Sequence, residues 1–75
     1  MVGMRQLTAV IHREGDLYVA HCPELDVASQ GSTIDEAREN LIEALELFFE
    51  AASEDEVKRR FASEFYVTSV SVAVG

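Results

Sequence analysis

The most constraining feature of the sequence is the segment 33–52, in which apolar residues recur at steps of three and four. This spacing lays side chains along one side of an α-helix. Thr33 and Glu36 have the Thr-x-x-Glu spacing of a capping box, which starts a helix at Thr33. We therefore expect a helix whose apolar side faces the core. Its core-facing residues would be Ile34, Ala37, Leu41, Ala44, Leu45, Phe48 and Ala52.

The opposite side of this expected helix is acidic along its whole length. Its members are Asp35, Glu39, Glu43, Glu46 and Glu50. Like charges at these spacings destabilise an isolated helix by about 0.2–0.5 kcal/mol per pair. Two interpretations are open: an ordinary solvated face, or a surface that meets a basic partner.

The length of 75 residues corresponds to one small domain, residues 1–75. A domain of this size buries only about 60% of the surface of its unfolded chain, so it needs additional stabilisation. The single cysteine, Cys22, excludes an internal disulfide, and no clustered Cys/His set predicts a structural zinc. We expect a homo-oligomer, either a dimer or a tetramer.

The net charge of −8 argues against direct binding to nucleic acid, because phosphates require Lys and Arg. No apolar run approaches the roughly 20 residues that span a bilayer, and the N-terminus lacks the pattern of a signal peptide. Together with the lone thiol, these features predict a cytoplasmic protein that does not bind membranes.

Two alternating runs near the N-terminus, residues 4–12 and 17–22, predict a β-hairpin. With Glu14 and Gly15 as the loop, one face of the hairpin is wholly apolar and would cover the helix. On that face Leu7 lies opposite Cys22, Ala9 opposite Ala20 and Ile11 opposite Tyr18. A bulged turn would shift the register by one residue and exchange the two faces.

Pro23 ends the second strand, because proline lacks the amide donor of a sheet. A turn over residues 24–26 and a short third strand over 27–30 then lead to the helix. Ser53 and Glu56 repeat the capping spacing and predict a short second helix, with Val57 and Phe61 as its buried pair. We interpret its basic residues 58–60 as a charge cluster at the helix C-terminus rather than as a phosphate site.

Residues 65–74 carry no charge and alternate valine with small residues, which predicts a last strand with neighbours. The expected order is β-β-β-α-β, an α+β sandwich of two layers with a possible short second helix before the last strand. In this arrangement the fourth strand returns parallel to the first through a right-handed crossover.

Candidate catalytic and metal-binding groups do not converge in this scheme. The expected register separates His12 and His21 by about 13 Å along the strands and places Cys22 on the other face. We therefore expect no catalytic residue, no metal site and no cofactor. Glu24 and Asp26 lie close together in the turn, where they are either solvated or part of a binding surface.

Several short segments resemble the signature of the HicB antitoxin family. They are Tyr18-Val19-Ala20, Cys22-Pro23-Glu24-Leu25, Ser29-Gln30-Gly31, Thr33, Glu36-Ala37, Asn40 and Glu43-Ala44. The resemblance spans about residues 7–50 and implies a partial ribonuclease H-like fold. Family members neutralise HicA toxins, which are small basic mRNA interferases. Many also carry a C-terminal DNA-binding domain, whereas this chain ends at Gly75, so the resemblance implies the N-terminal-type domain without that extension.

The resemblance implies a toxin-neutralising protein that is not an enzyme. Charge and exposure select the expected partner-binding residues, which are Glu24, Asp26, Glu39, Glu43, Glu46 and Glu50. The alternative is an orphan oligomeric domain that binds a ligand or has a regulatory role, with no toxin partner. Its ligand would lie between subunits near Tyr18, His21 and Cys22. A nuclease is the third and least favoured reading, because the first and last expected strands contain no Asp or Glu in residues 4–12 and 65–74.

Overall fold

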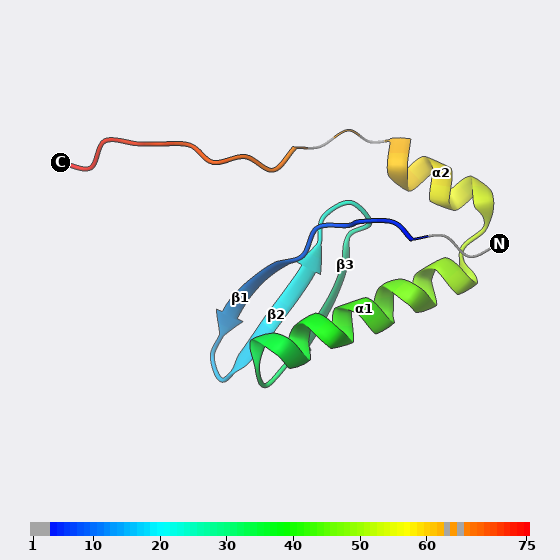
Figure 1. Ribbon diagram of the computed structural model, residues 1–75, viewed down its shortest axis with the longest axis horizontal. Coiled ribbons are helices and arrows are strands. Elements are labelled where there is room, and N and C mark those ends of the chain that lie inside the picture. The colour runs from blue at the N-terminus through cyan, green and yellow to red at the C-terminus, as the bar shows by residue number, and fades with distance from the viewer. Residues whose placement is uncertain (1–3, 63, 65) are drawn as a thin grey trace.

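The computed structural model describes residues 4–62, 64 and 66–75 and has an α+β fold (Figure 1). Its elements are β1 (Val10–Glu14), β2 (Leu17–Cys22), β3 (Val27–Gly31), α1 (Ile34–Ala51) and α2 (Glu54–Ala62). The strands form one antiparallel sheet in the order β1-β2-β3. Helix α1 covers one face of this sheet and packs mainly on β3, less on β2 and least on β1.

The hairpin of β1 and β2 has the predicted faces but a different register. Val10 lies opposite His21 and Ile11 opposite Ala20, so each pairing differs by two residues from the expected one. The loop is Gly15-Asp16 and not Glu14-Gly15. Because side chains alternate with a period of two, a shift of two residues leaves every side chain on its expected face.

The turn conformation explains the register. Gly15 has a φ of +63° at the first loop position, which is the pattern of a type II′ turn and favours glycine there. A Cβ at Gly15 would meet no atom within 4 Å, so the backbone angle and not crowding selects glycine.

The hairpin is shorter than predicted at its open end, because β1 begins at Val10 and no strand is found over residues 4–9.

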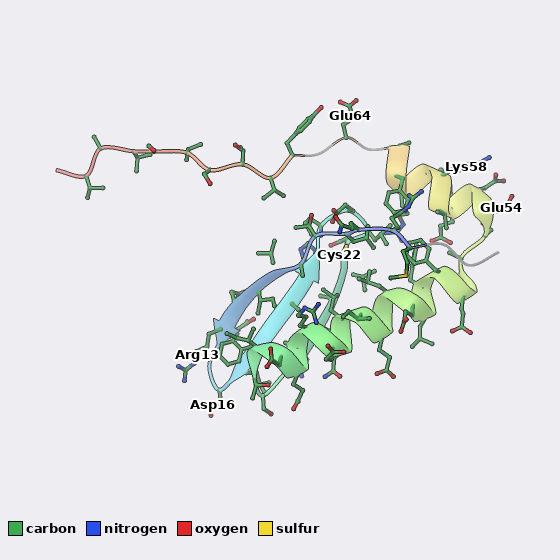
Figure 2. The ribbon with its side chains drawn as sticks, viewed as in Figure 1. Arg13, Asp16, Cys22, Glu54, Lys58 and Glu64 are labelled. Atoms are coloured by element: carbon green, nitrogen blue, oxygen red, sulfur yellow. The ribbon has the colours of Figure 1, made fainter. Side chains whose placement is uncertain are left out.

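Four residues, 23–26, connect β2 to β3, and Cys22 pairs with Val27 across the loop. Pro23 follows directly after β2, as the sequence predicted. Asp26 closes the loop with a φ of +53°, a conformation that aspartate tolerates better than most residues. Figure 2 places Cys22 near this loop, at the opposite end of the hairpin from Arg13 and Asp16.

Helix α1 begins at the predicted capping box. The Thr33 hydroxyl accepts a hydrogen bond from the Glu36 amide at 3.0 Å. The Glu36 carboxylate reaches back to the Ser32 amide at 3.1 Å, one residue before the expected N-cap amide. At the other end Ala52 is the C-cap and donates its amide to the Phe48 carbonyl, which confirms the predicted end of the helix.

The core lies between α1 and the sheet. Its buried residues are Ala20, Cys22, Leu25, Ala37 and Leu41. The predicted helix stripe is confirmed at its centre, where Ala37 and Leu41 are buried and Leu45 and Phe48 pack beside them. The prediction is wrong for Ile34, which is 52% exposed in the first turn.

Helix α2 confirms the second predicted cap, because the Glu56 amide donates to the Ser53 hydroxyl at 3.2 Å. Neither residue of its expected buried pair is fully buried: Val57 and Phe61 are both half-buried, and Phe61 packs against the core cluster. Arg60 ties the helix to the β2–β3 loop by donating to the Leu25 carbonyl at 2.8 Å.

The predicted fourth strand does not form: residues 66–75, the C-terminal tail, are extended but pair with no strand among the described residues. Phe65, where that strand was expected to begin, lies outside the described residues. In Figure 1 the tail leaves α2 and runs clear of the sheet. The radius of gyration is accordingly 14.7 Å, whereas a compact chain of this length has one of about 11 Å.

Candidate functional site

The acidic side of α1 is the most strongly charged surface that a single element presents. All five of its predicted residues, Asp35, Glu39, Glu43, Glu46 and Glu50, are exposed. We call this row the acidic stripe. Arg38 contacts one end of it, with its guanidinium 3.0 Å from the Glu39 carboxylate. The last turn of α1 contains no basic residue.

The acidic stripe is electrostatically unfavourable for the isolated helix. Its members follow one another at steps of three and four, so neighbouring carboxylates repel along the helix surface. Glu46 and Glu50 also lie toward the helix C-terminus, where the macrodipole disfavours negative charge. A partner that supplies cations to this surface would relieve both effects, so the stripe is suited to binding a basic protein.

The predicted turn residue Glu24 is directed inward. Its Oε2 accepts hydrogen bonds from the Thr8 amide at 2.9 Å and from the Thr8 hydroxyl at 2.7 Å. Its Oε1 accepts from the Cys22 thiol at 3.4 Å. Glu24 thereby anchors the N-terminal segment to the loop that follows β2. Its contact with a partner stays a prediction.

The surroundings of Glu24 and Cys22 shift their proton affinities in opposite directions. Partial burial by itself raises the pKa of Glu24, but the hydrogen bonds from Thr8 and Cys22 outweigh it and leave that pKa below its usual value. Burial raises the pKa of the Cys22 thiol, and the neighbouring Glu24 carboxylate adds to the increase. The thiol is therefore held in its protonated, unreactive form.

Asp26 is the more accessible acid of the same loop. Its side chain is 86% exposed, and its Oδ1 lies 2.9 Å from Nε2 of His21. His21 projects from the sheet face that α1 leaves uncovered, because the residues before and after it on β2, Ala20 and Cys22, are buried and side chains alternate between faces. Asp26 is therefore available to a partner together with His21.

The three residues of the alternative ligand site do not converge. Tyr18 and Cys22 lie on the helix-covered face of β2, whereas His21 lies on the open face. The observed register brings His12 and His21 closer than predicted, to diagonal positions about 7–8 Å apart. Each is paired with its own carboxylate, and no three potential metal ligands gather among the described residues.

A hollow of about 390 Å³ lies between the β2–β3 loop and α2, and the sequence did not predict it. Its lining combines Pro23, Glu24, Leu25, Asp26, Glu56, Arg59 and Arg60. Arg60 is engaged on both sides, by the Leu25 carbonyl at 2.8 Å and by the Glu56 carboxylate at 3.5 Å. Of the basic residues of α2, Arg60 thus docks the helix. The only signal in the sequence was their clustering.

Comparison with protein-family models, curated proteins and solved structures finds no match for this chain. Within the described residues, no helix has the length and apolar character that crossing a membrane requires.

Proposed function

We propose that this chain is an antitoxin-type binding protein that neutralises a small, basic, HicA-like mRNA interferase. The observation that carries the proposal is the acidic stripe: five exposed carboxylates in a row on α1, with one arginine beside them. A regular helix of 18 residues holds these charges in a fixed spacing. The resemblance of residues 18–44 to the HicB signature supplies the class of partner.

The mechanism we propose is electrostatic capture followed by steric cover. A toxin that cleaves mRNA presents cations to the phosphates of its substrate, and the acidic stripe offers carboxylates to the same cations. Complementary charge accelerates encounter and fixes orientation more than it adds affinity. The bound antitoxin then blocks the RNA-binding face, so no catalytic group of its own is required.

The residues assigned to this surface are Glu39, Glu43, Glu46 and Glu50 on α1, with Asp26 as an additional exposed acid. Glu24 enters the proposal as a positioning residue, because its hydrogen bonds to Thr8 hold the loop that presents Asp26. The proposed fold relationship is to a partial ribonuclease H-like domain. The order of three strands and a helix supports it, although the fourth strand is unpaired here.

The test is co-expression with the product of an adjacent small basic reading frame, followed by a salt titration of the purified complex. We expect a complex that suppresses RNA cleavage and whose affinity falls as salt increases. Glu43→Lys combined with Glu46→Lys should weaken it by at least about 10-fold, through both lost attraction and new repulsion.

Glu54→Lys combined with Asp55→Lys is the matched control, because it changes the net charge equally on the exposed first turn of α2. Equal losses of affinity in the two double variants would show that binding depends on net charge and not on the acidic stripe. Absence of any complex at low salt would reject the antitoxin function.

A further inference from the structure

The C-terminal tail has the sequence of a β-strand and no partner. Tyr66, Thr68, Val70, Val72 and Val74 fall on one side of the extended chain, and Val67, Ser69, Ser71 and Ala73 fall on the other. The three valines of the first side are 80%, 76% and 90% exposed. Residues 66–75 carry no charged side chain in a protein of net charge −8. An uncharged, β-branched segment of this kind is normally found inside a sheet.

The sheet has an open edge at β1. Helix α1 packs least on this strand, and β3 at the other edge is tied to α1 by the Asn40 side chain, which donates to the Gln30 carbonyl at 2.8 Å. The nine residues 66–74 span about 30 Å when extended. That is longer than the five residues of β1, so the tail can pair with the whole strand.

Helix α1 also has an uncovered apolar row on the side turned away from Asn40. It consists of Ile34, Ile42 and Phe49, which are 52%, 37% and 36% exposed. At 100° per residue Ile42 and Phe49 lie about 80–100° from the buried Leu41, on the flank opposite Asn40 and therefore toward β1, while Ile34 lies about 20° from Leu41 on the same side. A fourth strand beside β1 would cover this row with its valines and leave its serines on the open face.

The chain's own tail is directed away from this position. Helix α2 is docked at the β2–β3 loop through Arg60, and the Arg5 guanidinium lies 4.2 Å over the Phe61 ring. Helix α2 is therefore held beside the N-terminal segment, and residues 66–75 run clear of the sheet in Figure 1. In Figure 2 the side chains of the tail project alternately to the two sides of the extended chain.

From these features we infer that the tail of one copy adds as a fourth strand to the β1 edge of a second copy, reciprocally, in a strand-exchanged homodimer. The tail's valines cover the Ile34–Ile42–Phe49 row of the other chain, and its serines lie on the face of His12. Such an exchange is closed by a two-fold axis, so the β1 edge of each copy pairs with the tail of the other. The absence of charge in the tail avoids repulsion between two acidic chains.

Mass measurement by light scattering on the full chain tests for the dimer. Two double variants test which side of the tail faces the apolar row of α1. Val70→Asp with Val72→Asp places charges against the apolar row and should weaken dimerisation by at least about 100-fold. Ser69→Asp with Ser71→Asp adds the same charge to the open face and should weaken it far less. A full chain that is monomeric at all accessible concentrations, or equal losses in the two variants, would overturn the inference.

Disulfide trapping distinguishes exchange from folding back. One chain carries His12→Cys and the other carries Ser69→Cys, Ser71→Cys or Ala73→Cys in turn, all in a Cys22→Ala background. We expect a mixed disulfide between the two different chains at one of these positions. When both cysteines are placed in one chain, a link within that chain would show that the tail folds back on its own β1. Self-linking of the tail-only variants would show tail-to-tail pairing. Either result would overturn the inference, and neither bears on toxin binding.

Discussion

Thr8 donates two hydrogen bonds to the carboxylate of Glu24, one from its amide and one from its hydroxyl. The Thr8 amide and hydroxyl lie 2.9 and 2.7 Å from the same oxygen of Glu24, across sixteen positions of sequence. This pair fixes the segment before β1 to the loop after β2. It closes the end of the hairpin that the strand pairing, which begins at Val10 and His21, leaves open.

Replacing this carboxylate should destabilise the fold. Glu24→Gln keeps the shape but loses the charge that both Thr8 donors contact. Since hydrogen bonds to charged groups contribute about 1.5–3 kcal/mol, we expect a loss of about 1–3 kcal/mol in the free energy of unfolding. Urea denaturation measures it. The control is Glu43→Gln on the exposed face of α1, which should change stability by less than about 0.5 kcal/mol; similar losses in both variants would contradict the role of the pair.

The lowered pKa of Glu24 predicts how stability depends on pH. The group is ionised more readily in the folded than in the unfolded chain, so its contribution is fully present above its ordinary value of 4.5. That contribution is lost as the pH falls through the lowered pKa of the folded state. The difference in unfolding free energy between the native chain and Glu24→Gln should therefore shrink below pH 4.5. A difference that stays constant down to pH 2 would count against this assignment.

Gly31 should not tolerate any side chain. A Cβ at this position would lie 2.5 Å from the Ala37 amide nitrogen and 2.8 Å from the Glu36 carbonyl carbon, both backbone atoms of α1. Gly31→Ala therefore forces the helix away from β3, and we expect a loss of about 1–3 kcal/mol by thermal or urea unfolding. Gly75→Ala, where nothing lies within 4 Å, is the matched control and should be neutral.

Arg60 should hold α2 in place. Its guanidinium donates to the Leu25 carbonyl and lies 5.5 Å from the centre of the Phe48 ring. Arg60→Ala removes both contacts, and a loss of about 1.4 kcal/mol would make the amides of α2 exchange with solvent about 10-fold faster. Arg59→Ala tests the neighbouring cation on the same helix. Equal acceleration in both variants would show that helix propensity or charge, and not docking, is responsible.

Periodicity predicted those features that depend on neighbours in the sequence. Helix α1 begins at the Thr33 cap and ends within one residue of the expected position. The hairpin faces were also predicted, because they depend only on alternation. The register was predicted wrongly, because the loop was placed at Glu14-Gly15, whereas glycine at the first loop position followed by Asp16 is the signal of the type II′ turn that forms.

The features that the sequence could not predict depend on distant partners. Glu24 reads as a solvated turn acid until Thr8 is placed beside it. The prediction of a strand over the tail was wrong, because a strand exists only when another strand supplies its hydrogen bonds, and the local sequence does not identify that partner. The acidic stripe was predicted in full, because it needs only the helical spacing of five residues that all stay exposed.

The buried Cys22 can serve as an intrinsic probe of local opening. Its thiol is enclosed by the core and donates to Glu24, so a thiol reagent in solution can reach it only when the loop after β2 opens. Because this is the sole cysteine of the chain, each modified molecule records one opening event. The rate of labelling at fixed reagent concentration therefore reports, without any added probe, how often this end of the domain loosens.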